Sequence, residues 1–104
     1  MSRPLRIGRE ADAERTAASR WYEAQRVGLG EKFMAAIDTA LRLIESNPAV
    51  GSRPPGVKDE DVRRVLVRRF PYDVVYMELP DRIQVLAIAH ERRRPGYWAD
   101  RIQR

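Results

Sequence analysis

Apolar residues recur at a helical spacing in two stretches of the first half of the chain. The first stretch predicts a helix over residues 11–27, and the second predicts a helix that ends at Asn47, because a residue before proline is pushed out of the α region. Gly28 and Gly30 lie between the stretches and tolerate a positive φ, so they favour a short turn and a helical hairpin. The apolar positions are Ala17, Ala18, Trp21 and Tyr22 in the first stretch, and Phe33, Ile37, Ala40, Leu41 and Ile44 in the second.

Strand-like segments flank this hairpin. Residues 4–8 alternate weakly and predict one short strand before it. Residues 48–61 hold three prolines and two glycines, which is typical of an exposed loop. Beyond the loop, three runs rich in valine, tyrosine and other strand-forming residues predict strands over 62–70, 72–79 and 82–90.

The last of these runs is apolar on both faces, which is typical of a central strand. Strict alternation places His90 on the same face as Leu86 and Ile88. The opposite face is then formed by Ile83, Val85, Ala87 and Ala89. We therefore expect one α+β domain over residues 1–104, with the order strand, two helices, three strands. The helical hairpin should pack on one face of a small antiparallel sheet.

The composition removes several kinds of site. Cysteine is absent from the 104 residues and His90 is the only histidine. No disulfide frame, thiolate metal site or multi-histidine cluster is therefore available, and we expect neither a metal nor another cofactor. No apolar stretch approaches the roughly 18 residues of a membrane span, and no charged-then-apolar signal region opens the chain. These features predict a cytoplasmic protein with no membrane partner.

The net charge of +5 is unevenly distributed along the chain. Residues 1–61 carry ten basic and ten acidic side chains, whereas residues 62–104 carry ten arginines and five acids. Arginine supplies 18 of the 20 basic residues, and its guanidinium suits bidentate binding of phosphate or carboxylate. The second half therefore favours a polyanion or an acidic protein segment as partner.

Residues 90–98, HERRRPGYW, gather reactive side chains directly after the predicted central strand. A histidine or a tyrosine can act as a general acid or base, and arginines can stabilise the charge of a phosphorane. Each residue also has a structural interpretation, in which His90 closes the end of the sheet, Tyr97 caps the core and Trp98 packs inside it. From the residues alone, both interpretations stay open.

Three segments together resemble one known family. They are WYEAQRVGLGEKF at 21–33, VRRVLVRRFPYDVVYME at 62–78 and RIQVLAIAHERRRPGYW at 82–98, and they are similar to the RelE/ParE superfamily of toxins from bacterial toxin–antitoxin, or plasmid stabilisation, modules. The resemblance spans nearly the whole chain. It implies a compact α+β toxin that inhibits growth and is held inactive by a cognate antitoxin encoded by the adjacent gene.

The resemblance leaves two mechanisms open. RelE-like members cut messenger RNA in the ribosomal A site, whereas ParE-like members bind DNA gyrase and block it. The candidate catalytic residues of a ribonuclease are His90, Arg92 and Tyr97, and the last two occupy approximately the positions of an arginine and a stacking tyrosine in the RNA-cleaving relatives. The candidate target-binding or antitoxin-binding residues are Arg64, Arg68, Arg69, Arg92, Arg93 and Trp98.

Two departures from the RNA-cleaving pattern favour the ParE-like mechanism. Cleaving members have an arginine beside a third-strand aromatic residue, but here Asp73 follows Tyr72, and a carboxylate repels phosphate. Such members also use upstream lysines, and this chain has only Lys32 and Lys58. We therefore expect a type II toxin that binds gyrase. A ribosome-dependent mRNA endoribonuclease and a non-toxic basic interaction module are the alternatives.

Overall fold

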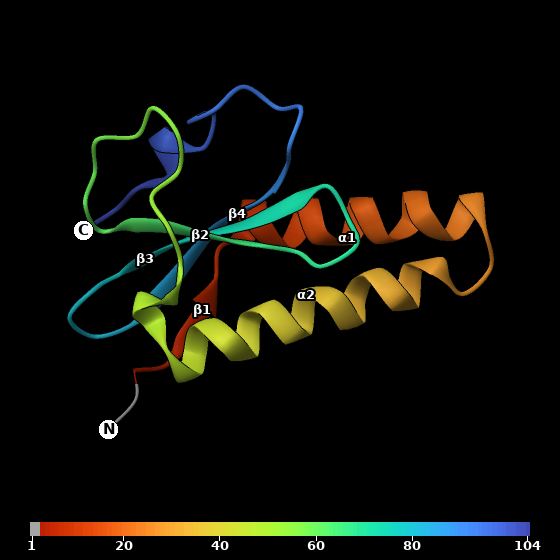
Figure 1. Cartoon of the computed structure of the whole chain (residues 1–104), viewed down its shortest axis with the longest axis horizontal. Helices are drawn as coiled ribbons and strands as arrows, with labels where there is room; N and C mark the ends of the chain where they lie inside the picture. Colours follow the sequence, from red (N-terminus) through yellow and green to blue (C-terminus); the bar gives the residue numbers. More distant parts are fainter. Residues whose placement is uncertain (1–2) are drawn as a thin grey trace.

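A four-stranded sheet and a helical hairpin make up the protein, as Figure 1 shows for the computed structural model, which describes residues 3–104. The elements are β1 (Leu5–Ile7), α1 (Arg9–Gln25), α2 (Leu29–Ser46), β2 (Val62–Leu66), β3 (Tyr72–Glu78) and β4 (Ile83–His90), with 3₁₀ turns at Pro48–Val50 and Ala99–Arg101. The predicted α+β class and element order are confirmed. Within residues 3–104, none of the helices has the length and apolar character needed to cross a membrane.

The strand order in the sheet is β1-β4-β3-β2. The three later strands pair antiparallel as predicted, but β1 runs parallel to β4, so the sheet is mixed. The parallel pair arises because the helical hairpin carries the chain from β1 across to the far edge, from which two antiparallel reversals bring β4 back beside β1. The prediction that the last strand is central is confirmed.

The helical hairpin is tighter than the sequence predicts. The left-handed Gly28, with φ of 89°, lies at the turn, and α2 already begins at Leu29. Gly30 therefore lies inside α2, where it lets the two helices approach closely: a Cβ at this position would lie 2.7 Å from the Ser19 carbonyl oxygen of α1. The Glu23 carboxylate of α1 accepts hydrogen bonds from the amides of Gly28 (2.9 Å) and Gly30 (3.0 Å), and so satisfies free N–H groups at the start of α2.

Replacing Gly30 by alanine should therefore destabilise the protein by about 1 to 3 kcal/mol, the usual effect of overpacking against a rigid backbone. Urea denaturation would measure this change. Glu31→Ala alters the exposed neighbour on the same helix and serves as the control, with an expected change below about 0.5 kcal/mol. Equal stability of the two variants would show that the helices have room to separate.

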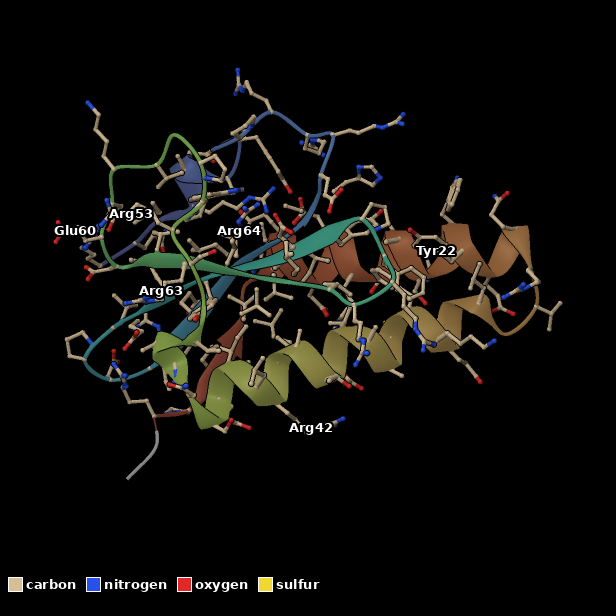
Figure 2. The ribbon with its side chains drawn as sticks, in the orientation of Figure 1. Tyr22, Arg42, Arg53, Glu60, Arg63 and Arg64 are labelled. Atoms are coloured by element: carbon tan, nitrogen blue, oxygen red, sulfur yellow. The ribbon has the colours of Figure 1, made fainter. Side chains whose placement is uncertain are left out.

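Tryptophan and tyrosine on α1 differ in burial. The sequence places Trp21 on the buried stripe, but its side chain is 60% exposed, so that prediction is wrong. The buried stripe is rotated toward Ala11 and Ala18. Tyr22, labelled on α1 in Figure 2, is partly buried. Its ring meets that of Phe70 in the β2–β3 turn, with the centroids 4.9 Å apart.

Strand β2 is four residues shorter than the predicted 62–70 run, since it ends at Leu66. The Val67 amide donates to the Tyr72 carbonyl oxygen at 2.8 Å, and Arg69 adopts a positive φ of 73°, so the chain turns here. The turn directs Phe70 back onto the ring of Phe33, with centroids 5.2 Å apart. Packing of Phe70 on the helical hairpin thus replaces continuation of the strand.

A β-bulge in β4 changes which residues share a face. Val85 is paired with Tyr76 and Ala87 with Val75, so Leu86 is an extra residue without a partner of its own. The alternation therefore shifts by one: His90 shares the hairpin-facing side with Ile88, as predicted, but Leu86 lies on the other side. The predicted grouping of Ala87 and Ala89 with Ile83 and Val85 is wrong for the same reason.

Both faces of the sheet bury apolar side chains. The face toward the helices forms a core with Phe33, Ile37, Ile44, Val74, Tyr76, Ile83, Val85 and Ile88. The opposite face forms a second core with Val62, Val75, Met77, Leu79, Leu86, Ala87, Ala89 and Trp98. The predicted packing of the hairpin on one face is thus confirmed, and the segment after β4 covers the other.

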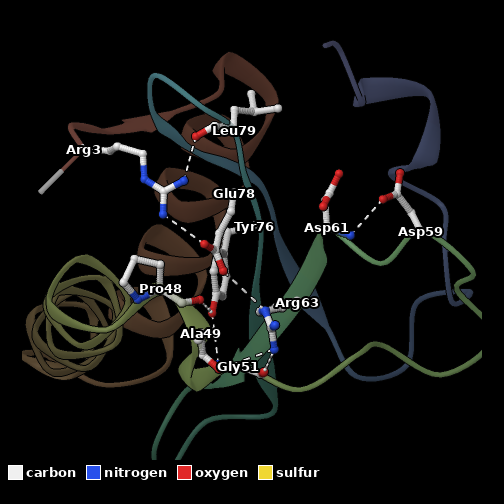
Figure 3. A network of polar contacts seen from close by, with 10 residues as sticks. All are labelled: Arg3, Pro48, Ala49, Gly51, Asp59, Asp61, Arg63, Tyr76, Glu78 and Leu79. Atoms are coloured by element: carbon white, nitrogen blue, oxygen red, sulfur yellow. Dashed lines mark hydrogen bonds and ion pairs between the residues drawn. The ribbon is translucent and has the colours of Figure 1, made fainter.

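Hydrogen bonds hold the start of the proline-rich segment that precedes β2 (Figure 3). The buried Tyr76 hydroxyl donates to the Pro48 carbonyl oxygen at 2.6 Å and accepts from the Gly51 amide at 3.0 Å. Arg63 donates to the Gly51 carbonyl oxygen at 2.9 Å and lies 3.5 Å from Glu78. This segment, predicted as an exposed loop, is therefore fixed to the sheet at its first turn.

Candidate functional site

A groove runs between α1 and the residues that follow β4. Its volume is about 560 Å³. Apolar and aromatic side chains form most of the lining. The charged and polar groups come from α1, at Glu14, and from the end of β4 and the loop after it, at His90, Arg93 and Tyr97. We call it the α1 groove; it is lined by Glu14, Ala17, Ala18, Trp21, Tyr22, Pro71, Tyr72, Ile88, His90, Arg93 and Tyr97.

Glu14 organises one end of the groove. Its Oε1 accepts the Ile88 amide at 3.1 Å, and its Oε2 accepts the Tyr97 hydroxyl at 2.6 Å. Arg101 donates to both carboxylate oxygens, at 2.9 and 3.2 Å, and to the Leu86 carbonyl oxygen at 3.0 Å. We call these interactions the Glu14 hub. They join the first helix, the central strand and the last 3₁₀ turn, and they saturate the only carboxylate that lines the groove.

Tyr97 is held firmly in this arrangement. Burial raises the pKa of its phenol, and the hydrogen bond to Glu14 raises it further. The Arg93 guanidinium lies 4.0 Å from the ring centroid and that of Arg101 lies 5.1 Å from it. The hydroxyl proton is therefore committed to Glu14, and arginine already covers the ring, so Tyr97 is poorly suited to proton transfer or to stacking on a base.

His90 also has a structural partner. Its Nδ1 accepts the Arg92 amide at 3.0 Å, and its ring meets the edge of the Tyr72 ring at 5.0 Å. With Nδ1 occupied as an acceptor, the neutral ring carries its proton on Nε2 and has no free lone pair with which to act as a base. His90 and Tyr97 line the same groove, but they do not form a ready acid–base pair.

Five arginines lie on two loops at the end of the sheet next to the groove. The β2–β3 turn carries two of them and the loop after β4 carries three, and the Glu91 amide ties these loops together by donating to the Pro71 carbonyl oxygen at 2.9 Å. All five are exposed, and none forms an ion pair with the described residues 3–104. We call this set the arginine cap: Arg68, Arg69, Arg92, Arg93 and Arg94.

Asp73 lies on the other face of the sheet. It is 8% exposed and its Oδ2 accepts from Arg64 Nη1 at 3.0 Å. The two residues line a second cavity of about 410 Å³ beneath the loop after β4, and His90, Arg93 and Tyr97 line both this cavity and the α1 groove. Asp73 is therefore paired with an arginine and does not line the α1 groove, which weakens the predicted repulsion of phosphate there.

The structure divides the sequence-derived candidates into groups. His90, Arg93 and Tyr97 line the α1 groove, and Arg68, Arg69 and Arg92 belong to the adjoining cap. Arg64 is paired with Asp73 on the opposite face, and Trp98 is 3% exposed in the second core. Trp98 therefore packs inside the core, as its structural interpretation in the sequence analysis predicted, and is not available to a partner.

Sequence reasoning missed the Glu14 hub. Glu14 lies three residues after Ala11 and four before Ala18, so it is a carboxylate on the buried stripe of a helix. Such a position signals a buried partner, because a carboxylate is rarely buried unpaired. The identity of the partner, Arg101, has no local signal, since it lies 87 residues away.

Residues 3–104 contain no group of three or more His, Cys, Asp or Glu side chains suited to a metal ion.

Comparison with known proteins identifies the family. The family model described as the ParE toxin of the type II toxin–antitoxin system parDE matches residues 5–95. This chain belongs to the ParE toxin family. It is the toxin component of a type II toxin–antitoxin system, and an antitoxin is its partner. The expectations of a RelE/ParE toxin are thus confirmed.

A solved structure described as the chromosomal ParDE TA system from P. aeruginosa has the same fold as this ParE-family toxin. The two are 22% identical and superpose with a TM-score of 0.63 over 86% of this chain and 96% of that chain. At this level of identity, the structural similarity supports a shared fold but not a shared target. No match was found in a search of curated proteins.

Proposed function

We propose that this toxin acts by binding DNA gyrase and does not cut RNA. The observation that carries the proposal is the Glu14 hub, because it occupies the Tyr97 hydroxyl that an RNA-cleaving site would use. The Nδ1 of His90 is occupied as well. A site in which the tyrosine proton and the acceptor nitrogen of the histidine are both occupied is suited to binding, and the ParE branch of the superfamily acts through binding.

The antitoxin that neutralises it is proposed to be the product of the adjacent gene. Arg68, Arg69, Arg92 and Arg93 are the proposed contacts with the antitoxin or the target, because they are exposed and have no acidic partner among residues 3–104. Arg64 is a weaker candidate, since Asp73 already neutralises it.

Inducible expression without the neighbouring gene should arrest growth, and co-expression of that gene should restore it. The purified toxin should inhibit supercoiling of relaxed plasmid by gyrase and leave ribosome-bound messenger RNA intact. Cleaved message with unaffected supercoiling would instead establish the endoribonuclease. Normal growth at verified soluble expression would favour the non-toxic basic module.

Replacing His90 by alanine separates binding from catalysis. We expect the variant to inhibit gyrase within about threefold of the parent, because most residues of a binding interface contribute little to affinity when they are truncated. A ribonuclease that used His90 would lose roughly 10²-fold or more in rate. Folded His90→Ala protein that no longer cuts ribosome-bound message, where the parent does, would overturn the proposal.

A further inference from the structure

We infer that the α1 groove and the arginine cap together bind single-stranded nucleic acid, with phosphates on the cap and a base stacked on Trp21. This inference goes beyond gyrase inhibition and does not depend on it, since the binding is a property of the isolated toxin. The partner is defined by its chemistry: a flexible polyanion whose flat aromatic bases are free to leave the stack.

The first support is the distribution of ion pairs. Of the ten arginines in residues 62–104, five are paired with carboxylates and the other five form the arginine cap. The pairs are Arg63–Glu78, Arg64–Asp73, Arg82–Asp81, Arg101–Glu14 and Arg104–Asp59. Every uncompensated arginine of this half therefore lies at one end of the sheet, where Glu91 is the only acid on the two loops. Guanidinium groups in such a cluster fit phosphate oxygens by paired hydrogen bonds.

The second support is a row of aromatic rings beside the cap. Trp21 is 60% exposed and its ring meets the edge of Tyr22 at 5.2 Å. Tyr22 lies 6.3 Å from Tyr72, which in turn lies 5.0 Å from His90. These rings line the α1 groove, which ends at Arg93 of the cap. Stacking platforms next to a positive surface are the usual design of sites for single strands.

The third support is that hydrogen bonds within the protein already occupy part of the nearest strand edges. The edge of β4 beyond β1 is occupied by the Glu14 hub, through the Ile88 amide and the Leu86 carbonyl oxygen. The edge of β2 is occupied at Arg64, whose amide and carbonyl oxygen both bond to Ser52. A peptide that adds a strand needs free groups at such an edge. Part of each edge is not available to a peptide, whereas the guanidinium groups and rings are, and these suit a nucleic acid.

The test uses the purified full chain and fluorescently labelled 15-mers of thymidine and of uridine, with a 15-base-pair duplex for comparison. Single strands should bind at least tenfold more tightly than the duplex, since only unpaired bases can stack. Three to five phosphate contacts should give a slope of log affinity against log salt of about −2 to −3.5. Preference for thymidine or uridine would identify DNA or RNA as the source, and either result supports the proposal.

Single substitutions separate the contribution of phosphate contacts at the arginine cap from that of base stacking on Trp21. Arg68→Ala, Arg92→Ala and Arg93→Ala should each reduce the size of the salt slope by about 0.7, whereas Arg42→Ala should leave it unchanged. Arg42 is an exposed arginine on α2, on the far side of the hairpin from the cap (Figure 2), and provides the matched loss of charge. Trp21→Ala should weaken binding by about 5- to 100-fold, the usual worth of one stacked base.

Three results would overturn the proposal: equal effects of Arg42→Ala and the cap variants, a duplex that binds as tightly as the single strands, or full displacement of the labelled strand by polyglutamate of the same charge. The last would assign the surface to an acidic peptide. Because no gyrase is present, a failure here is distinct from a failure of the proposed function. Circular dichroism melting confirms the fold of each variant.

Discussion

Replacing Glu14 by alanine is expected to lower the free energy of unfolding by about 3 to 5 kcal/mol, the usual result of removing one partner of a largely buried ion pair. The side chains of Glu14 and Arg101 are only 19% and 17% exposed. The change would leave the Arg101 guanidinium, the Tyr97 hydroxyl and the Ile88 amide without their shared acceptor. Urea denaturation of the full chain measures the difference.

The matched control for this variant is Glu10→Ala. Glu10 is an exposed acid one helical turn earlier on α1, so its loss should change stability by less than about 0.5 kcal/mol. Glu14→Gln keeps the volume and one of the two acceptor oxygens, and should fall between the two. If Glu14→Ala unfolds at the same urea concentration as Glu10→Ala, the hub does not hold the three segments together.

Replacing Phe33 by alanine should also destabilise the protein by about 3 to 5 kcal/mol, because the change leaves a large cavity in the core. Phe33 is fully buried, and its ring contacts those of Tyr22, Phe70 and Tyr72 at centroid distances of 5.2, 5.2 and 5.1 Å. A variant that does not fold should lose growth inhibition as well. Thermal melting of the purified protein gives the direct measurement.

Trp21→Ala is the natural comparison, since Trp21 has a similar place in the sequence pattern but is exposed. The substitution should lower the free energy of unfolding by less than about 1 kcal/mol, because most of the Trp21 side chain is already in contact with water. The sequence pattern alone predicts equal losses for the two variants. A loss above about 3 kcal/mol for Trp21→Ala would mean that the face of α1 was assigned wrongly.

Local patterns predicted the elements of the fold but not how they meet. The apolar period of α2 and the proline at position 48 correctly predicted the buried face and the end of that helix, because both signals act within a few residues. The bulge at Leu86 and the parallel pairing of β1 with β4 were missed, since each depends on a strand elsewhere in the chain. The burial of Trp21 was misjudged because one aromatic residue cannot fix the rotation of a helix.

The candidate site was predicted in part. HERRRPGYW does follow the central strand, and five of its residues contribute to the groove or the cap: His90, Arg92, Arg93, Arg94 and Tyr97. Their hydrogen bonds could not be predicted, because the partner of Tyr97 is 83 residues away. That partner decides whether the phenol is available for chemistry. A residue type in a motif thus predicts what it can do, while its distant neighbours decide whether it is free to do it.

The connections of the groove have a consequence for the folding kinetics. β1 pairs with β4 through Leu5 and Ile83, and Glu14 meets Arg101 across 87 residues. Contacts this distant raise the contact order, so chain closure should be slow compared with formation of the local helical hairpin. The hairpin can form early, but the groove is completed only when β4 and the residues around Arg101 dock on α1. No continuous fragment that lacks either end of the 14–101 span can therefore form the groove.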